Sequence, residues 1–82
     1  MEDISLRARV QRMVRTGEIP CEDGKVWAGR GVGTHCAVCG LPIAPTEIEF
    51  EVALESGGTL RLHRGCHEVW RDECAALTDA AG

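Results

Sequence analysis

Apolar and polar residues follow helical spacing at the start of the chain. One apolar stripe runs along residues 3–16, with charged and polar residues on the rest of the helical wheel. Its members are Leu6, Val10, Met13 and Val14. Gly17 is well placed to end the helix, because glycine adopts the left-handed backbone that often follows a last helical turn. We therefore predict an N-terminal amphipathic helix and assign residues 1–17 to it.

A different period appears between Glu47 and Glu55, where apolar residues alternate with glutamates. This alternation predicts a strand with one buried face and one acidic, exposed face. A Ser-Gly-Gly-Thr turn follows, and the alternation resumes over residues 60–63, so the two strands form a β-hairpin. From Cys66 onward apolar residues return to helical spacing, which predicts a C-terminal helix that begins near Gly65 and fades in the Ala-rich tail.

Residues 18–35 carry no such regular pattern. Pro20 and an Asp-Gly pair interrupt the first part, and glycines alternate with other residues over 29–33. We expect an irregular, Gly-rich connection here, with at most a short extended piece at residues 25–27. With no internal repeat and no longer linker, residues 1–82 form a single α+β domain.

Composition makes the stability of this domain a question. The chain has 82 residues with one Phe, two Trp and no Tyr, so its core is small. Five cysteines are available, and small domains are often stabilised by disulfides or a structural metal. The N-terminus is charged throughout, which is unlike a secretory signal, and no apolar run approaches the ~20 residues of a membrane span. We therefore expect a reducing, cytoplasmic location without membrane contact, and no disulfide pairing.

Four residues have the spacing of metal ligands. A Cys-x2-Cys pair is separated by 23 residues from a His-x2-Cys pair; the members are Cys36, Cys39, His63 and Cys66. Gly40 relieves the backbone where the first pair curls, and the second pair spans the end of a strand and the first turn of a helix. Three thiolates and one imidazole suit tetrahedral Zn²⁺. We expect one structural zinc, with the ligand atoms within about 4 Å of one another.

The order of knuckle, hairpin and helix resembles the treble-clef zinc fingers, and the spacing is similar to the first zinc module of LIM domains. The likeness covers residues 36 to about 74. The sequence also resembles small bacterial zinc-finger proteins. The second zinc module of LIM domains has no counterpart here. We accordingly assign residues 36–78 to a zinc-binding lobe. The resemblance implies a binding scaffold, because treble clefs serve protein and nucleic-acid recognition.

Alternatives remain for the other cysteines and histidines. His67 competes with Cys66 as the fourth ligand, because it stands four residues after His63. Iron could replace zinc at a thiolate-rich site, and a redox Cys-x2-Cys pair is a further option. A second zinc site could use Cys21, His35, His67 and Cys74. We expect instead that Cys74 is a small buried hydrophobe on the apolar stripe of its helix and that Cys21 is a spare thiol.

No catalytic set of residues emerges, so we expect a protein that is not an enzyme. The leading hypothesis is a noncatalytic zinc module that binds a protein partner through the acidic strand face or the N-terminal helix. The alternative is a nucleic-acid-associated regulator that uses the arginines of that helix, Arg7, Arg9, Arg12 and Arg15, together with Arg30. The net charge of −4 disfavours this alternative. The sequence indicates neither the identity of the partner nor the oligomeric state.

Overall fold

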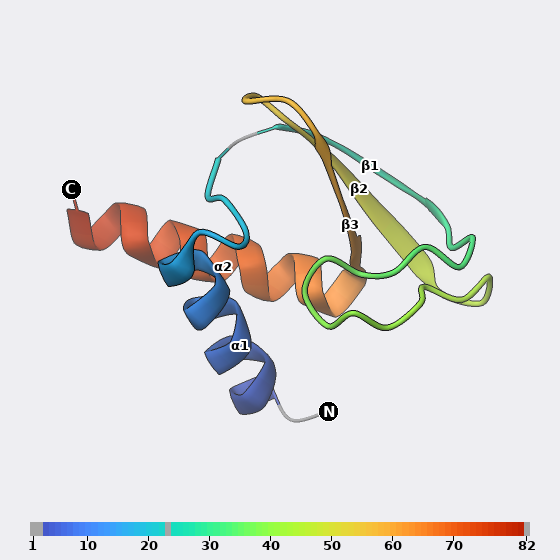
Figure 1. Cartoon of the computed structure of the whole chain (residues 1–82), viewed down its shortest axis with the longest axis horizontal. Coiled ribbons are helices and arrows are strands. Elements are labelled where there is room, and N and C mark those ends of the chain that lie inside the picture. Colours follow the sequence, from blue (N-terminus) through green and yellow to red (C-terminus); the bar gives the residue numbers. More distant parts are fainter. Residues whose placement is uncertain (1–2, 23, 82) are drawn as a thin grey trace.

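The computed structural model describes residues 3–22 and 24–81. Two helices and a three-stranded antiparallel sheet follow one another in the order α1, β1, β2, β3 and α2 (Figure 1). Their bounds are Asp3–Thr16 for α1, Gly24–Arg30 for β1, Ile48–Leu54 for β2, Thr59–His63 for β3 and Arg64–Ala81 for α2. The predicted α+β class is confirmed. Residues 1, 2, 23 and 82 of the predicted ranges lie outside the described residues.

Helix α1 matches its sequence pattern. Leu6, Val10 and Met13 are buried, and Gly17 ends the helix at a φ of +81°. The amides of Glu18 and Ile19 both donate to the Met13 carbonyl, which satisfies an acceptor that a helix end leaves open. The predicted apolar stripe is therefore the face by which α1 packs onto the rest of the domain.

Strands β2 and β3 form the predicted hairpin, with Val52 opposite Leu60 and Phe50 opposite Leu62. The tight connection contains Gly57 and Gly58, both with positive φ, a backbone region that residues with a Cβ rarely adopt. Val52 and Leu62 are fully buried, which confirms the apolar face of this hairpin.

The irregular connection expected over residues 18–35 is wrong in its central part. Residues 24–30 form the full-length strand β1, antiparallel to β2, with Trp27 opposite Glu51. β1 has a weak pattern because six of its seven residues are exposed, so no alternation of buried and exposed positions marks it. Gly24 permits close pairing, since a Cβ there would lie 2.1 Å from the Ala53 carbonyl oxygen.

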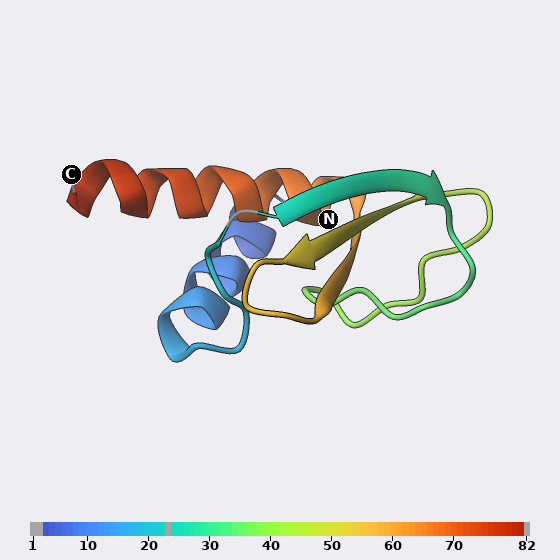
Figure 2. The same cartoon turned by 90° about the horizontal axis from the view of Figure 1, so that it is seen from above.

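Helix α2 runs parallel to the long axis over part of the molecule, with α1 on one flank and the sheet on another (Figures 1 and 2). It begins one residue before its expected start and continues to Ala81, beyond the expected end near residue 78. Trp70 is buried at its centre and donates its indole N–H to the Pro20 carbonyl at 2.8 Å. Neither described helix combines the length and apolar character that a membrane crossing requires.

Candidate metal centre

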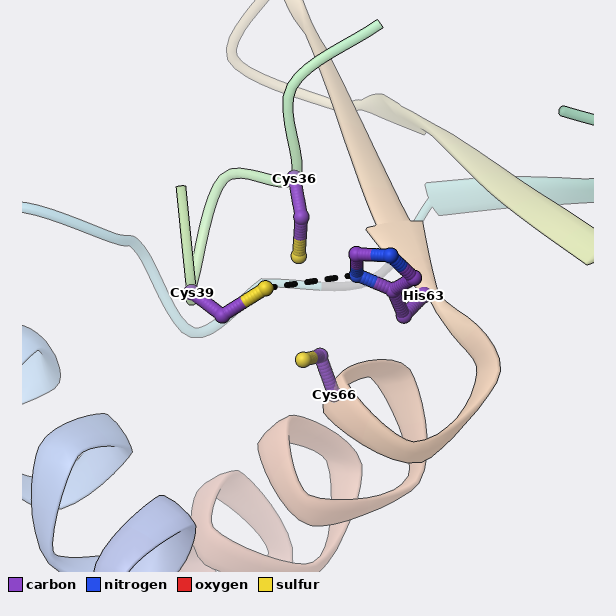
Figure 3. A group of neighbouring side chains, drawn as sticks. All are labelled: Cys36, Cys39, His63 and Cys66. Carbon is purple, nitrogen blue, oxygen red and sulfur yellow. Dashed lines mark hydrogen bonds between the residues drawn. The ribbon is translucent and has the colours of Figure 1, made fainter. Parts of the chain in front are cut away.

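The tertiary structure brings the four predicted ligand residues together. Figure 3 shows their side chains pointing toward a common centre from three parts of the chain: the loop before β2, the end of β3 and the first turn of α2. One ligand atom from each of Cys36, Cys39, His63 and Cys66 can be chosen so that all four lie within 4.8 Å of one another. The widest separation slightly exceeds the predicted 4 Å. The cluster could hold one metal ion.

The loop that carries the first pair has the backbone of a metal-binding knuckle. The Val38 amide donates to the Cys36 sulfur at 3.4 Å, and the Gly40 amide donates to the Cys36 carbonyl at 3.0 Å. Gly40 has a φ of +76°, so glycine is needed where the chain curls back. N–H donation stabilises negative charge on sulfur, which favours the thiolate that a metal requires.

His63 presents one ring nitrogen to the cluster and the other to the protein. Its Nδ1 lies 3.3 Å from the Cys39 sulfur, while its Nε2 lies 3.3 Å from the Pro42 carbonyl oxygen and 3.5 Å from Oε1 of Glu47. A metal-binding histidine commonly donates its second N–H to a carbonyl or carboxylate, which fixes the tautomer and the ring orientation. Pro42 and Glu47 provide such acceptors for Nε2, and Nδ1 is left as the ligand atom.

The cluster concentrates negative charge on one sulfur. A hydrogen bond with the Cys66 thiol lowers the pKa of Cys36 to about 4. The same hydrogen bond, together with burial, raises the pKa of Cys66, and burial raises the pKa of Cys39. Burial lowers the pKa of His63, but the hydrogen bond and negative charge of Cys36 outweigh it, so this pKa is raised. A divalent cation would stabilise all three thiolates at once.

Apolar packing covers the inner half of the cluster. Cys36 and Cys66 are buried, whereas Cys39 and His63 are half-buried. Val38, between the two knuckle cysteines, is fully buried with Ile43. The Arg9 side chain of α1 donates to the Val38 carbonyl, so the N-terminal helix is tied directly to the knuckle. The site therefore lies at the edge of the core.

His67 lies outside the cluster. It is buried at 4% exposure, and its ring stacks on Phe50 with centroids 4.6 Å apart. The Trp70 ring also lies near the His67 ring, with the two centroids 6.0 Å apart. Successive residues of a helix point about 100° apart, so His67 faces Phe50 of the sheet when Cys66 faces the knuckle, and Cys66 is the residue that joins the cluster.

The expectations for Cys21 and Cys74 are wrong. The two residues form a disulfide across a sequence separation of 53, with Cα atoms 5.4 Å apart. Cys21 is thus no spare thiol, Cys74 is no isolated hydrophobe, and neither is available for a second metal site. Disulfides persist mainly in oxidising environments, so this bond weighs against the predicted cytoplasmic location.

The acidic strand face is also not the free surface that the sequence suggested. Arg61 binds both Glu49 and Glu51 at 2.9 Å, and Glu49 is buried at 7% exposure. Glu47 accepts the Ala44 amide at 2.9 Å and faces His63. Arg61, on the next strand β3 and directly opposite Glu51, was the signal for this pairing, because it alternates onto the same face as the glutamates.

Comparison with known proteins yields no relative: no protein family, curated protein or solved structure matches this chain. The site must therefore be interpreted from its own geometry. The four clustered residues are recognisable in the sequence because each pair has a fixed local spacing. The disulfide and strand β1 are not, since neither has a local pattern.

Proposed function

We propose that this chain is a noncatalytic zinc-binding module in which one structural Zn²⁺ supports a surface for protein interaction. The observation that carries the proposal is the convergence of three sulfurs and one imidazole nitrogen within 4.8 Å. This donor set suits tetrahedral zinc, and four protein ligands would leave no position for a substrate. The ligands would be Cys36, Cys39, His63 and Cys66.

The zinc would strengthen links that the knuckle already makes through the hydrogen bonds from the Ala37 amide to the Arg61 carbonyl of β3 and from Arg9 of α1 to the Val38 carbonyl. Apart from an isolated β-bridge between His35 and Pro42, the residues from the knuckle to β2 form no helix or strand. Binding free energies of ~10–16 kcal/mol in zinc-finger peptides are large compared with the total stability of a small domain. One ion would therefore fix the knuckle to the hairpin and to the start of α2.

The arrangement supports a treble-clef interpretation. A knuckle, the hairpin β2–β3 and helix α2 follow in that order, with ligand pairs from the knuckle and from the start of the helix. Such domains serve as binding scaffolds. We propose a protein partner because the free energy of zinc binding would hold a small surface rigid, which lowers the entropic cost of association.

The nucleic-acid alternative loses support from the contacts of α1. Arg7 binds Glu73 at 2.7 Å and Arg9 donates to the Val38 carbonyl, so two of the four helix arginines have partners within the domain. Arg12 and Arg15 are exposed. Affinity for DNA or RNA that falls steeply with salt would restore this alternative.

Native mass spectrometry of the purified chain tests the zinc proposal. We expect one zinc per chain, and visible absorption of the Co²⁺-substituted protein with the bands of a tetrahedral thiolate site. Cys66→Ser should lose the metal. Cys74→Ser is the matched control on the same helix and should retain it. A wild-type chain that is folded without metal, or that carries iron instead, would contradict the proposal.

A further inference from the structure

Strand β1 is an unpaired edge of the sheet. The order β1-β2-β3 leaves one side of β1 without a neighbouring strand. The Gly31 amide donates to the Glu47 carbonyl, so the backbone groups of odd-numbered residues in this ladder point toward β2. The backbone N–H and C=O groups of Val26, Ala28 and Arg30 therefore point away from β2. Within residues 3–22 and 24–81 no backbone hydrogen bond from another segment occupies these outward groups, which are a template for another strand.

A groove lies along the same edge. It has a volume of about 530 Å³ and is lined by Val26 and Val52 from the sheet and by His67, Trp70 and Arg71 from α2, with the Cys21–Cys74 disulfide at one end. Val26 and Val52 are cross-strand neighbours, so their side chains share the face that is turned toward α2. In an added strand, the side chains opposite Val26 and Ala28 would point to this same face, and the one opposite Val26, which lines the groove, would enter it.

The exposed side chains around this edge are apolar or basic. Val26 is 46% exposed and Trp27, on the opposite face of β1, is 52% exposed. β1 contains two cations, Lys25 and Arg30, and no acid, and Arg71 adds a third cation at the groove. The one acid that lines the groove, Glu22, accepts the Ser56 amide at 2.7 Å.

His67 adds a polar group to the helix side of the groove. Its ring is 4% exposed, and its Nε2 has no hydrogen-bond partner in the described part of the chain. Buried polar atoms are normally paired, so such an atom at a binding groove is consistent with a partner that arrives from outside.

We infer that β1 and the groove beside α2 form a docking site for an extended, acidic peptide segment of a partner protein, which adds to the sheet as a fourth strand. Backbone hydrogen bonds to Val26, Ala28 and Arg30 hold the segment, as in other cases of strand addition. Its apolar side chains enter the groove, and its carboxylates pair with Lys25, Arg30 and Arg71. The inference deepens the proposed function, on which it rests for a protein partner.

The test uses the full zinc-loaded chain and a capped hexapeptide of alternating glutamate and valine, followed by NMR. We expect the amide resonances of Val26, Ala28 and Arg30 to move on titration up to about 1 mM peptide, a range suited to weak strand-addition contacts. The same peptide with lysine in place of glutamate should cause no such shifts.

Two pairs of variants separate backbone docking from charge. Ala28→Pro removes an outward N–H without removing a bond to β2, and should weaken binding about tenfold or more; Ala28→Val, which keeps the N–H, should not. Arg71→Glu should weaken binding of the acidic peptide by about tenfold, because it puts a like charge at the groove. Arg12→Glu makes the same charge change on α1 and should leave binding unchanged.

Several results would overturn the inference. These are the absence of shifts in β1, equal binding of the lysine peptide, equal binding by Arg71→Glu, or β1 shifts that follow protein concentration without peptide, which would show that β1 pairs with a second copy. The zinc content is measured on the same samples. A chain that binds the peptide but holds no zinc would refute the zinc proposal alone, and a zinc-loaded chain that ignores the peptide would refute the docking site alone.

Discussion

Helix α2 is joined to other parts of the chain at two places, which we call clamps: the candidate metal cluster and the Cys21–Cys74 disulfide. Near its start, Cys66 belongs to a cluster whose other members come from the knuckle and from β3. Two turns later, Cys74 is bonded to Cys21 in the connection that follows α1. The first clamp would depend on a metal held by thiolates; the second is one covalent bond that depends on redox conditions. The same residue type thus serves two purposes on one helix, and the geometry around each sulfur decides which.

The surroundings of the two clamps explain the difference. The cluster sulfurs are supported by the Val38 amide and lie beside His63, whose ring is oriented by Pro42 and Glu47. These contacts stabilise charge, as a metal site requires. Cys21 is exposed and Cys74 is half-buried, and the sequence places no histidine or second cysteine within three residues of either, the spacing of the ligand pairs. A pair of sulfurs without further ligands and with closely spaced Cα atoms is suited to a disulfide.

Removal of the metal should have the largest effect. We expect a strong chelator to unfold the knuckle and the sheet, because a contribution on the order of 10 kcal/mol exceeds the stability of most small domains. Amide hydrogen exchange checks this, with loss of protection in β2 and β3 before the disulfide-linked part of α2. Full protection of the sheet in the metal-free chain would contradict a structural role.

Removal of the disulfide should be milder. The double variant Cys21→Ser with Cys74→Ser opens a loop of 53 residues and should lower the free energy of unfolding by about 2–4 kcal/mol. Zinc content should be unchanged, because neither residue lies in the cluster. Denaturant titration with and without reductant provides the measurement. If reductant destabilised the double variant as much as the wild type, the disulfide would not be the source of the effect.

Glu47→Gln tests the support of His63. Gln keeps an oxygen for the Ala44 amide but removes the charge that faces Nε2, so zinc affinity should fall about tenfold, at the low end of such effects. A chelator competition assay measures the change. Glu51→Gln is the control, since Glu51 of β2 pairs with Arg61 of β3 and faces no ligand. Equal losses in both variants would assign the effect to the strand rather than to His63.

The ion pair between α1 and α2, beside the disulfide, should have the smallest effect. Hydrogen bonds from Arg7 and then Gln11 lower the pKa of Glu73 below its ordinary value of 4.5. The stability contributed by Glu73 is therefore complete above pH 4.5 and is lost as the pH falls through the lowered pKa. Glu73→Gln should cost less than about 1 kcal/mol, a typical limit for an ion pair with an exposed partner.

The pH profile distinguishes this interaction from acid release of the metal. The difference between Glu73→Gln and the wild type should be constant from about pH 8 to pH 5.5, because the carboxylate stays ionised in both folded and unfolded chains there. Thermal unfolding at several pH values checks it, with Glu68→Gln, whose partner is the exposed Arg64, as the control. A difference that shrinks between pH 8 and pH 6 would show that another group is involved.

These two regions also differ in how far they follow from sequence. The cluster was found because each ligand pair lies within four residues, where the knuckle or the strand-to-helix junction fixes the geometry. The rejection of His67 needed the structure, since only the direction of α2 against the sheet shows that His67 stacks on Phe50. Strand β1 was hidden because an exposed edge strand has no buried face to impose a period of two.

The sequence by itself determined the local features of this protein: the helix α1, the hairpin, the start of α2 and the paired spacing of the candidate ligands. These features depend on periodicity and on residues only a few positions apart, so they can be predicted from the sequence. Tertiary structure alone decided that Cys21 meets Cys74, that Glu49 is buried against Arg61, and that β1 closes one side of a groove with α2. Each of these contacts joins segments that are far apart in the sequence and are brought together by the packing of α1 and the sheet around α2. No local sequence pattern shows which distant segments meet.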